Sequence, residues 1–173
     1  KLICMVGRFS EQKDQTTLIK AMKKLPSDVH LLLVGEGPLK EKNQNLAKEI
    51  GVEDRVHFLG FRNDVPRILR TVDIVVLSSH WEGFGLAAVE GMAAGKPVVA
   101  SDVPGLGDIV QGAGMLFLKE NSAELADKIK KLFQEEDEYN KVVKRCIARA
   151  GSLSIKRMLE RYINVYKELS RKM

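Results

Sequence analysis

Two carboxylates, Glu82 and Glu90, stand eight residues apart around a glycine-rich stretch that could bind an anion. Gly83 and Gly85 follow the first carboxylate, and glycine lets the backbone turn tightly. The small and apolar residues from Leu86 to Ala94 then predict a buried helix. The N-terminus of such a helix carries unpaired N–H groups and about half a positive charge, so this pattern favours a phosphate-binding turn.

The position of Glu90 leaves two interpretations open. Its charge would lie inside an apolar helix, where an unpaired carboxylate is costly. We therefore expect Glu90 to be buried with a partner, which is either a hydroxyl-rich ligand or a buried Arg or Lys. In the second interpretation Glu82 is merely a solvated loop acid.

A longer stretch, EGFGLAAVEGMAAGKPVVASDVPG, resembles the E-x7-E region of the retaining glycosyltransferases of the GT-B fold, glycosyltransferase family 4 or group 1. The resemblance implies that Glu82 binds hydroxyl groups of the donor sugar and that Glu90 binds those of the ribose. It also implies backbone N–H groups that face the phosphate and sugar of a nucleotide-diphosphate sugar, at Gly83, Phe84, Gly85 and Leu86.

Two cations, Arg8 and Lys13, follow the apolar stretch Leu2 to Val6, which predicts a buried strand. They would lie at the carboxyl edge of the sheet, near the Glu82 turn, and could neutralise a diphosphate, although basic loop residues are more often merely solvated. GRF with Lys13 resembles the GR…K element of the same family. This implies that Gly7, Arg8 and Lys13 contact the donor phosphates, and that Arg8, Lys13 and Glu82 are the catalytic residues.

Two further strand ends carry candidate binding residues. The stretch GEGPLK lacks the third glycine of a dinucleotide fingerprint, so an NAD site is rejected. The resemblance places Gly37 of this stretch near the nucleoside, while an ordinary turn explains it equally well. Phe61 and Arg62 follow another short strand, where the family's loop passes the nucleobase, and Asp64 is expected to cap the next helix.

Six apolar segments alternate with helical patterns along the chain. This order predicts an α/β fold: a Rossmann-like, doubly wound parallel sheet of about six strands, with helices on both faces and a C-terminal helical extension. The predicted strands are residues 2–6, 29–34, 56–59, 74–77, 97–100 and 115–118.

Length and composition fit one globular domain, since the chain has 173 residues of which 45% are hydrophobic and 29% charged. The chain begins at Lys1 inside a predicted strand, so we expect a fragment of a longer protein. By the resemblance, residues 1–173 are the C-terminal, donor-binding half of a GT-B enzyme, without its N-terminal acceptor domain. Such a domain should bind the donor but turn over poorly alone.

The C-terminal region is basic and amphipathic. Ten Lys or Arg residues lie in residues 141–173, against Glu160 and Glu168. Solvated helix faces explain this charge, and attraction to an anionic membrane is the alternative. Apolar residues also recur at helical spacing in residues 154–173. In the family this helix crosses to the other domain, so we expect its far end, around Tyr166 and Leu169, to be under-buried.

No cofactor and no metal are expected. The chain lacks an Asp-x-Asp motif, and its three histidines are scattered; His80, beside Trp81, is more often packed or solvated than ligand-binding. Two distant cysteines and no apolar stretch of about 18 residues favour the cytoplasm, with the inner membrane face as an alternative. The expected partners are a nucleotide-sugar donor and an acceptor sugar or lipid-linked glycan, with no nucleic acid. A sugar-nucleotide epimerase and a non-catalytic nucleotide-sugar-binding module remain as alternatives.

Overall fold

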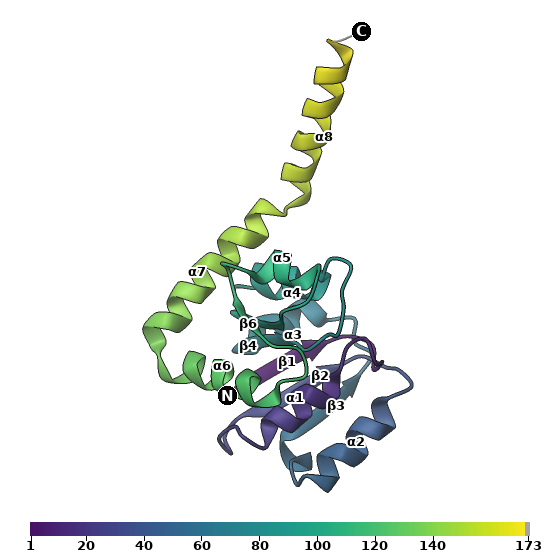
Figure 1. The fold of residues 1–173 in the computed structure, drawn as a ribbon, viewed down its shortest axis with the longest axis vertical. Coiled ribbons are helices and arrows are strands. Elements are labelled where there is room, and N and C mark those ends of the chain that lie inside the picture. The colour runs from purple at the N-terminus through teal and green to yellow at the C-terminus, as the bar shows by residue number, and fades with distance from the viewer. Residues whose placement is uncertain (172–173) are drawn as a thin grey trace.

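A six-stranded parallel sheet forms the centre of the computed structural model, which describes residues 1–171. The strand order is β3-β2-β1-β4-β5-β6, the order of doubly wound nucleotide-binding folds. Figure 1 shows the sheet between its helices. The strands are β1 Leu2–Val6, β2 His30–Val34, β3 Val56–Gly60, β4 Ile74–Leu77, β5 Val98–Ser101 and β6 Met115–Phe117. The predicted fold class is confirmed.

The central strands are buried on both faces. This explains why they read as continuous apolar runs, as strands of a parallel sheet do. Ile3 of β1 pairs with Ile74 of β4, and Val75 pairs with Val98 of β5. β5 begins one residue later than predicted, at Val98. The preceding Pro97 still contributes its carbonyl, which accepts a hydrogen bond from the Val75 N–H at 3.0 Å.

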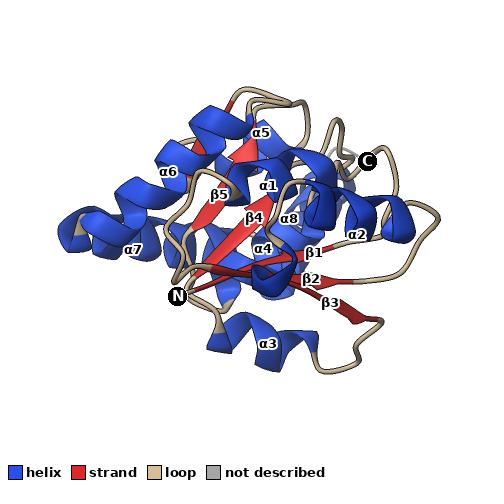
Figure 2. Ribbon diagram, turned by 90° about the horizontal axis from the view of Figure 1, so that it is seen from below, coloured by secondary structure: helices blue, strands red, loops and turns tan. Residues whose placement is uncertain are grey.

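Helices cover both faces of the sheet (Figure 2). α1, α2 and α6 pack together on one face, and α3, α4 and α7 lie on the other. The helices are α1 Gln15–Met22, α2 Lys40–Glu49, the short η1 Glu53–Arg55, α3 Val65–Thr71, α4 Leu86–Ala93, α5 Leu106–Val110, α6 Ser122–Gln134, α7 Glu136–Ser152 and α8 Ile155–Ser170.

Small residues let α4 lie unusually close to the sheet. Its buried side consists of Ala88, Gly91 and Met92. A Cβ atom on Gly91 would stand 2.9 Å from the Val75 side chain on β4, which is too close for a carbon contact. This close packing fixes where the N-terminus of α4 emerges at the carboxyl edge of the sheet.

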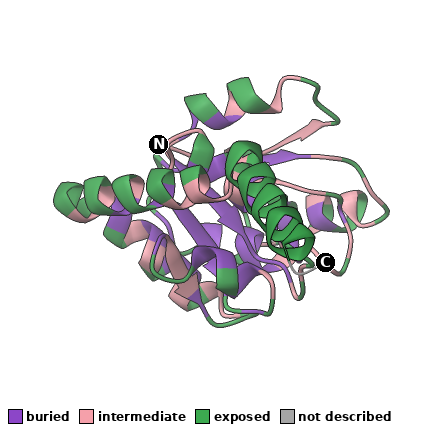
Figure 3. Cartoon of the chain, turned by 90° about the horizontal axis from the view of Figure 1, so that it is seen from above, coloured by how far each residue is buried: buried purple, intermediate pink, exposed green. Residues whose placement is uncertain are grey.

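α8 projects from the body as an isolated helix, and its residues are exposed along its whole length (Figures 1 and 3). Tyr166 is 67% exposed and Leu169 56%, as expected for the far end, but Ile155 at the near end is also 72% exposed. The under-buried stripe therefore extends over the entire helix. Residues 172–173 of the expected helix lie outside the described residues.

No helix within residues 1–171 is long and apolar enough to cross a membrane.

The two cysteines, Cys4 and Cys146, are both buried free thiols, and burial raises the pKa of Cys4 to about 12. Neither cysteine is thus suited to act as a thiolate nucleophile.

Candidate functional site

The strand order itself points to the site. β1 has β2 on one side and β4 on the other, so the chain switches direction across the sheet at the β1/β4 boundary. In open α/β sheets, ligands bind in the crevice outside the carboxyl ends of the strands at this switch point. Two loops border the crevice here: residues 7–14 after β1, and residues 78–85 after β4.

An ion pair between Lys13 and Glu82 joins these two loops. The Glu82 side chain is only 8% exposed and that of Lys13 18%. The same carboxylate oxygen, Glu82 Oε1, also accepts a hydrogen bond from the Ser79 hydroxyl at 2.9 Å. Glu82 is therefore a buried, paired acid, and the interpretation of a solvated loop acid is wrong.

Further hydrogen bonds fix the two loops to each other. The Ser78 hydroxyl donates to the Asp14 carbonyl at 2.7 Å, and the His80 N–H donates to the Gln12 carbonyl at the same distance. From β5, the Ser101 hydroxyl donates to the Ser79 carbonyl. These serines are fully buried. The crevice is thus preorganised around the Lys13–Glu82 pair.

The N-terminus of α4 opens into the crevice without a side-chain cap. Gly85 occupies the N-cap position with φ 77°, a left-handed conformation that favours glycine. Nothing would crowd a Cβ atom on Gly83. The Ala88 N–H already donates to the Gly85 carbonyl at 2.9 Å. The N–H groups of Leu86 and Ala87 precede this first bond of the helix, so they remain available to an anion.

Arg8 adds a second cation at this edge of the sheet, in the loop after β1. Its side chain is exposed, and it has no ion-pair partner among residues 1–171. Its carbonyl accepts a hydrogen bond from the Gln15 side-chain amide at 2.9 Å, which holds the loop. Gly7 precedes Arg8, and a Cβ atom there would contact the Lys13 chain at 3.4 Å. The cations predicted at this edge are therefore both present, one paired and one free.

Glu90 does not lie where we expected it. It is exposed and forms no ion pair in the part of the chain that the structure describes, so its expected burial and the interpretation that it pairs with a buried Arg or Lys are wrong. A hydroxyl-rich ligand as its partner stays a prediction. The sheet-facing side of α4 is taken by Ala88, Gly91 and Met92. Glu90 instead lines a cavity of about 370 Å³ between α3 and α4, whose other walls include Val65. The carboxylate faces an open, partly apolar groove.

Gly37 and its neighbour Gly35 bring the loop after β2 against the loop after β1. A Cβ atom on Gly37 would overlap the backbone of Phe9, and one on Gly35 that of Gly7. Both glycines also have positive φ values. Close backbone packing thus explains these glycines without a ligand.

Phe61 and Arg62 lie after β3, at the edge of the sheet, and are exposed. The guanidinium of Arg62 forms a two-pronged contact with Asp64, with both N···O distances 2.8 Å. These hydrogen bonds lower the pKa of Asp64 and raise that of Arg62. Asp64 occupies the N-cap position of α3 but makes no side-chain cap, so the predicted capping role is wrong: its carboxylate is engaged by Arg62.

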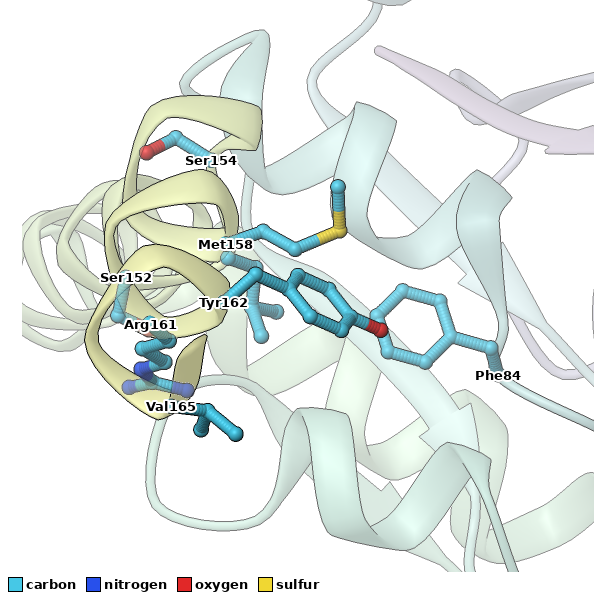
Figure 4. Close-up of a pocket in the computed structure, with 8 residues that line it drawn as sticks. Phe84, Ser152, Ser154, Met158, Arg161, Tyr162 and Val165 are labelled. Atoms are coloured by element: carbon cyan, nitrogen blue, oxygen red, sulfur yellow. The ribbon is translucent and has the colours of Figure 1, made fainter. Parts of the chain in front are cut away.

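Phe84 faces α8 (Figure 4). It shares a cavity of about 370 Å³ with Met158, Tyr162 and Val165. Figure 4 shows the rings of Phe84 and Tyr162 pointing toward each other across it. This cavity connects the turn after β4 to the exposed helix.

Sequence reasoning missed the serines that support the pair. Ser78 and Ser79 stand directly after a buried strand, which is a usable signal, but Ser101 reaches the site from another strand. Within residues 1–171 no three His, Cys, Asp or Glu side chains are arranged to hold a metal ion. The structure unites Gly7, Lys13 and Glu82, while Phe61 and Arg62 remain apart from them.

The sequence is similar to a family of known proteins. A family model described as glycosyl transferases group 1 matches residues 1–149. N-acetyl-alpha-D-glucosaminyl L-malate synthase from Bacillus anthracis is 32% identical over 141 residues, covering 79% of this chain and 37% of the relative. D-inositol 3-phosphate glycosyltransferase from Mycobacteroides abscessus is 38% identical over 142 residues, covering 76% of this chain and 32% of the relative.

A solved structure extends the comparison. HepE from Anabaena, in complex with UDP and glucose, superimposes with a TM-score of 0.86 at 28% identity, covering 95% of this chain and 48% of HepE. The chain thus spans about a third of the length of these curated relatives, and less than half of this solved one.

Proposed function

Since the chain belongs to the glycosyl transferases group 1 family, we propose that it is the donor-binding domain of a longer glycosyltransferase. The proposed reaction moves a hexosyl group from a nucleoside diphosphate to an acceptor, with retention of configuration. The observation that carries the proposal is the paired Lys13 and Glu82 at the switch point, beside the uncapped N-terminus of α4. The UDP and glucose bound by HepE support a nucleotide-sugar donor here.

The proposed roles follow from charge and position. Arg8 and Lys13 bind the diphosphate, together with the N–H groups from Gly83 to Leu86. Glu82 accepts hydrogen bonds from sugar hydroxyls, and Glu90 from the ribose. As the bond to the sugar breaks, the departing diphosphate becomes more negative, so fixed cations and a helix N-terminus stabilise the transition state more than the bound donor.

The acceptor belongs to a second domain in this proposal. The chain spans only about a third of its curated relatives, so the domain alone should bind the donor but turn over poorly. The exposed apolar side of α8 would pack on that second domain. Peripheral contact of basic α7 and α8 with a membrane stays a prediction, to be checked by sedimentation with anionic vesicles.

We expect α8 to exchange its amide hydrogens rapidly in the isolated domain. Its residues are exposed along the whole helix, with Tyr166 at 67%, so few contacts outside the helix protect its backbone. Hydrogen exchange measured by mass spectrometry on a monomeric sample would test this, with α6 as the buried reference helix. Strong protection through Leu169 in the monomer would mean that the helix folds onto its own domain, contrary to the proposal.

The domain should bind a nucleoside diphosphate without any metal ion. Arg8, Lys13 and the N-terminus of α4 supply the positive charge that a metal would otherwise provide. Calorimetry with UDP, GDP and ADP in the presence of EDTA would measure it. If binding required added magnesium or manganese, the assignment of Arg8 and Lys13 as the diphosphate-binding cations would be wrong. If no nucleotide bound with or without metal, the proposed donor-binding function would be wrong.

Glu90→Gln should weaken nucleotide binding with little change in stability. The carboxylate is exposed and lacks an ion-pair partner among the described residues, so its loss removes no contact that holds the empty protein together. Losing charged hydrogen bonds to a ribose would lower affinity by about tenfold or more. Calorimetry and thermal unfolding would be compared with Glu49→Gln, an exposed change in α2. A large fall in melting temperature with unchanged affinity would instead make Glu90 a structural residue.

A further inference from the structure

The imidazole of His80 lies where three loops at the carboxyl edge of the sheet meet. Its Nε2 atom is 3.1 Å from Asp14 Oδ2 and 3.4 Å from Glu120 Oε1. Asp14 ends the loop after β1, His80 belongs to the loop after β4, and Glu120 lies between β6 and α6. Residues far apart in the sequence thus converge on one nitrogen atom.

The two residues that contribute these carboxylates both have an unusual backbone conformation. Asp14 has φ 47° and Glu120 φ 65°, and within residues 1–171 no other non-glycine residue has a positive φ. Backbone of this kind persists only where its surroundings hold it, and it gathers at functional sites. Two residues with this rare backbone conformation contact the same imidazole, which indicates that the arrangement has a functional role.

Asp14 is the stronger of the two contacts because it is buried. Its side chain is 7% exposed, against 62% for Glu120, whose charge is largely screened by solvent. Asp14 Oδ1 accepts a hydrogen bond from the Thr17 N–H and caps α1. Asp14 Oδ2 and His80 Nε2 are both buried and have no aligned hydrogen-bond partner among the described residues, although they lie within bonding distance of each other. A small rotation of the ring would align them.

We propose that His80 is a positioning residue that fastens the loop carrying Glu82 to the loop carrying Lys13. Asp14 directly follows Lys13, and His80 precedes Glu82 by two residues. The contact therefore sets the spacing of the two loops whose side chains form the central ion pair. It also engages two carboxylates that would otherwise oppose an anion at the crevice. The proposal rests on the proposed function, because the anion is the donor's diphosphate.

His80→Phe tests this by keeping a ring against Trp81 while removing both nitrogen atoms. We expect the affinity for UDP, or for the nucleotide that binds best, to fall about tenfold by calorimetry. His57→Phe, on the edge strand β3 near its amino end, is the matched control and should leave affinity unchanged. Should His80→Phe fail to fold, His80→Gln keeps one N–H donor and should lose less affinity than that tenfold.

A triple variant separates positioning from charge. Asp14→Asn keeps the N-cap and tolerates a positive φ, and Glu120→Gln removes the second charge. Combined with His80→Phe, these changes leave no unpaired carboxylate at the crevice but do not restore the contact between the loops, so most of the loss of UDP affinity should persist. Full recovery of affinity in the triple variant, or no loss in His80→Phe, would overturn the proposal.

Thermal unfolding without ligand tests the contact independently of the proposed function. If the unmodified domain bound no nucleotide, the proposed function would fail, yet the thermal stabilities of His80→Phe, Asp14→Asn and the double variant would still report the contact. Non-additive changes would support the link between the loops, and additive changes would refute it.

Discussion

Lys13→Met should cost the domain about 3 kcal/mol of its free energy of unfolding, the lower end of the range for breaking a buried ion pair. The change leaves the Glu82 carboxylate without its cation, and this carboxylate is 8% exposed and keeps only the Ser79 hydroxyl as a partner within residues 1–171. Methionine retains most of the volume of the lysine chain, so packing against Gly7 is preserved. Urea unfolding followed by circular dichroism would measure the loss.

The same variant should bind a nucleoside diphosphate about 100-fold more weakly, since a hydrogen bond to a charged group is worth up to about 3 kcal/mol. A second variant, Lys13→Met with Glu82→Gln, distinguishes the two losses. It removes the stranded charge and should regain most of the stability, but the missing cation leaves affinity low. Recovery of affinity together with stability would show that Lys13 acts only on the fold.

The strands could be predicted because parallel strands buried on both faces are continuous apolar runs. Residues 74–77 match β4 along their whole length. The ends were less certain: Pro97 looks like part of its strand by composition, but the pairing starts at Val98. The extent of exposure on α8 was underestimated, because spacing identifies an apolar stripe without saying what covers it.

Sequence reasoning placed Lys13 and Glu82 at one edge of the sheet through the order of strands and turns. Their pairing depends on how two loops lie in space, which spacing alone does not contain. Glu90 was misplaced because α4 is small and apolar almost all round, so its sheet-facing side could not be identified. Asp14, His80 and Glu120 come from three different loops. No local sequence pattern therefore predicts that they converge.

Glu82→Gln should tighten the binding of a nucleoside diphosphate while weakening that of the sugar nucleotide. In the empty site the Glu82 carboxylate is paired with Lys13. A diphosphate must share that lysine while a negative charge stays beside it, so neutralising the charge should improve its affinity by about tenfold, or about 1.4 kcal/mol. A sugar nucleotide brings hydroxyl groups that donate to the carboxylate, and their loss should cost about 1.5 to 3 kcal/mol.

The gain at the diphosphate applies to both ligands, so the preference for sugar nucleotide over free diphosphate should fall by the lost hydroxyl contacts alone, about tenfold to 100-fold. Calorimetry with UDP and UDP-glucose would measure both affinities, and Ser79→Ala is the matched control because it removes a neighbour of the same oxygen without changing charge. Equal weakening of both ligands would contradict the argument and make Glu82 a structural residue. The expected opposite changes would mean that the carboxylate favours the loaded donor over the spent nucleotide, so that loss of the sugar itself loosens the product.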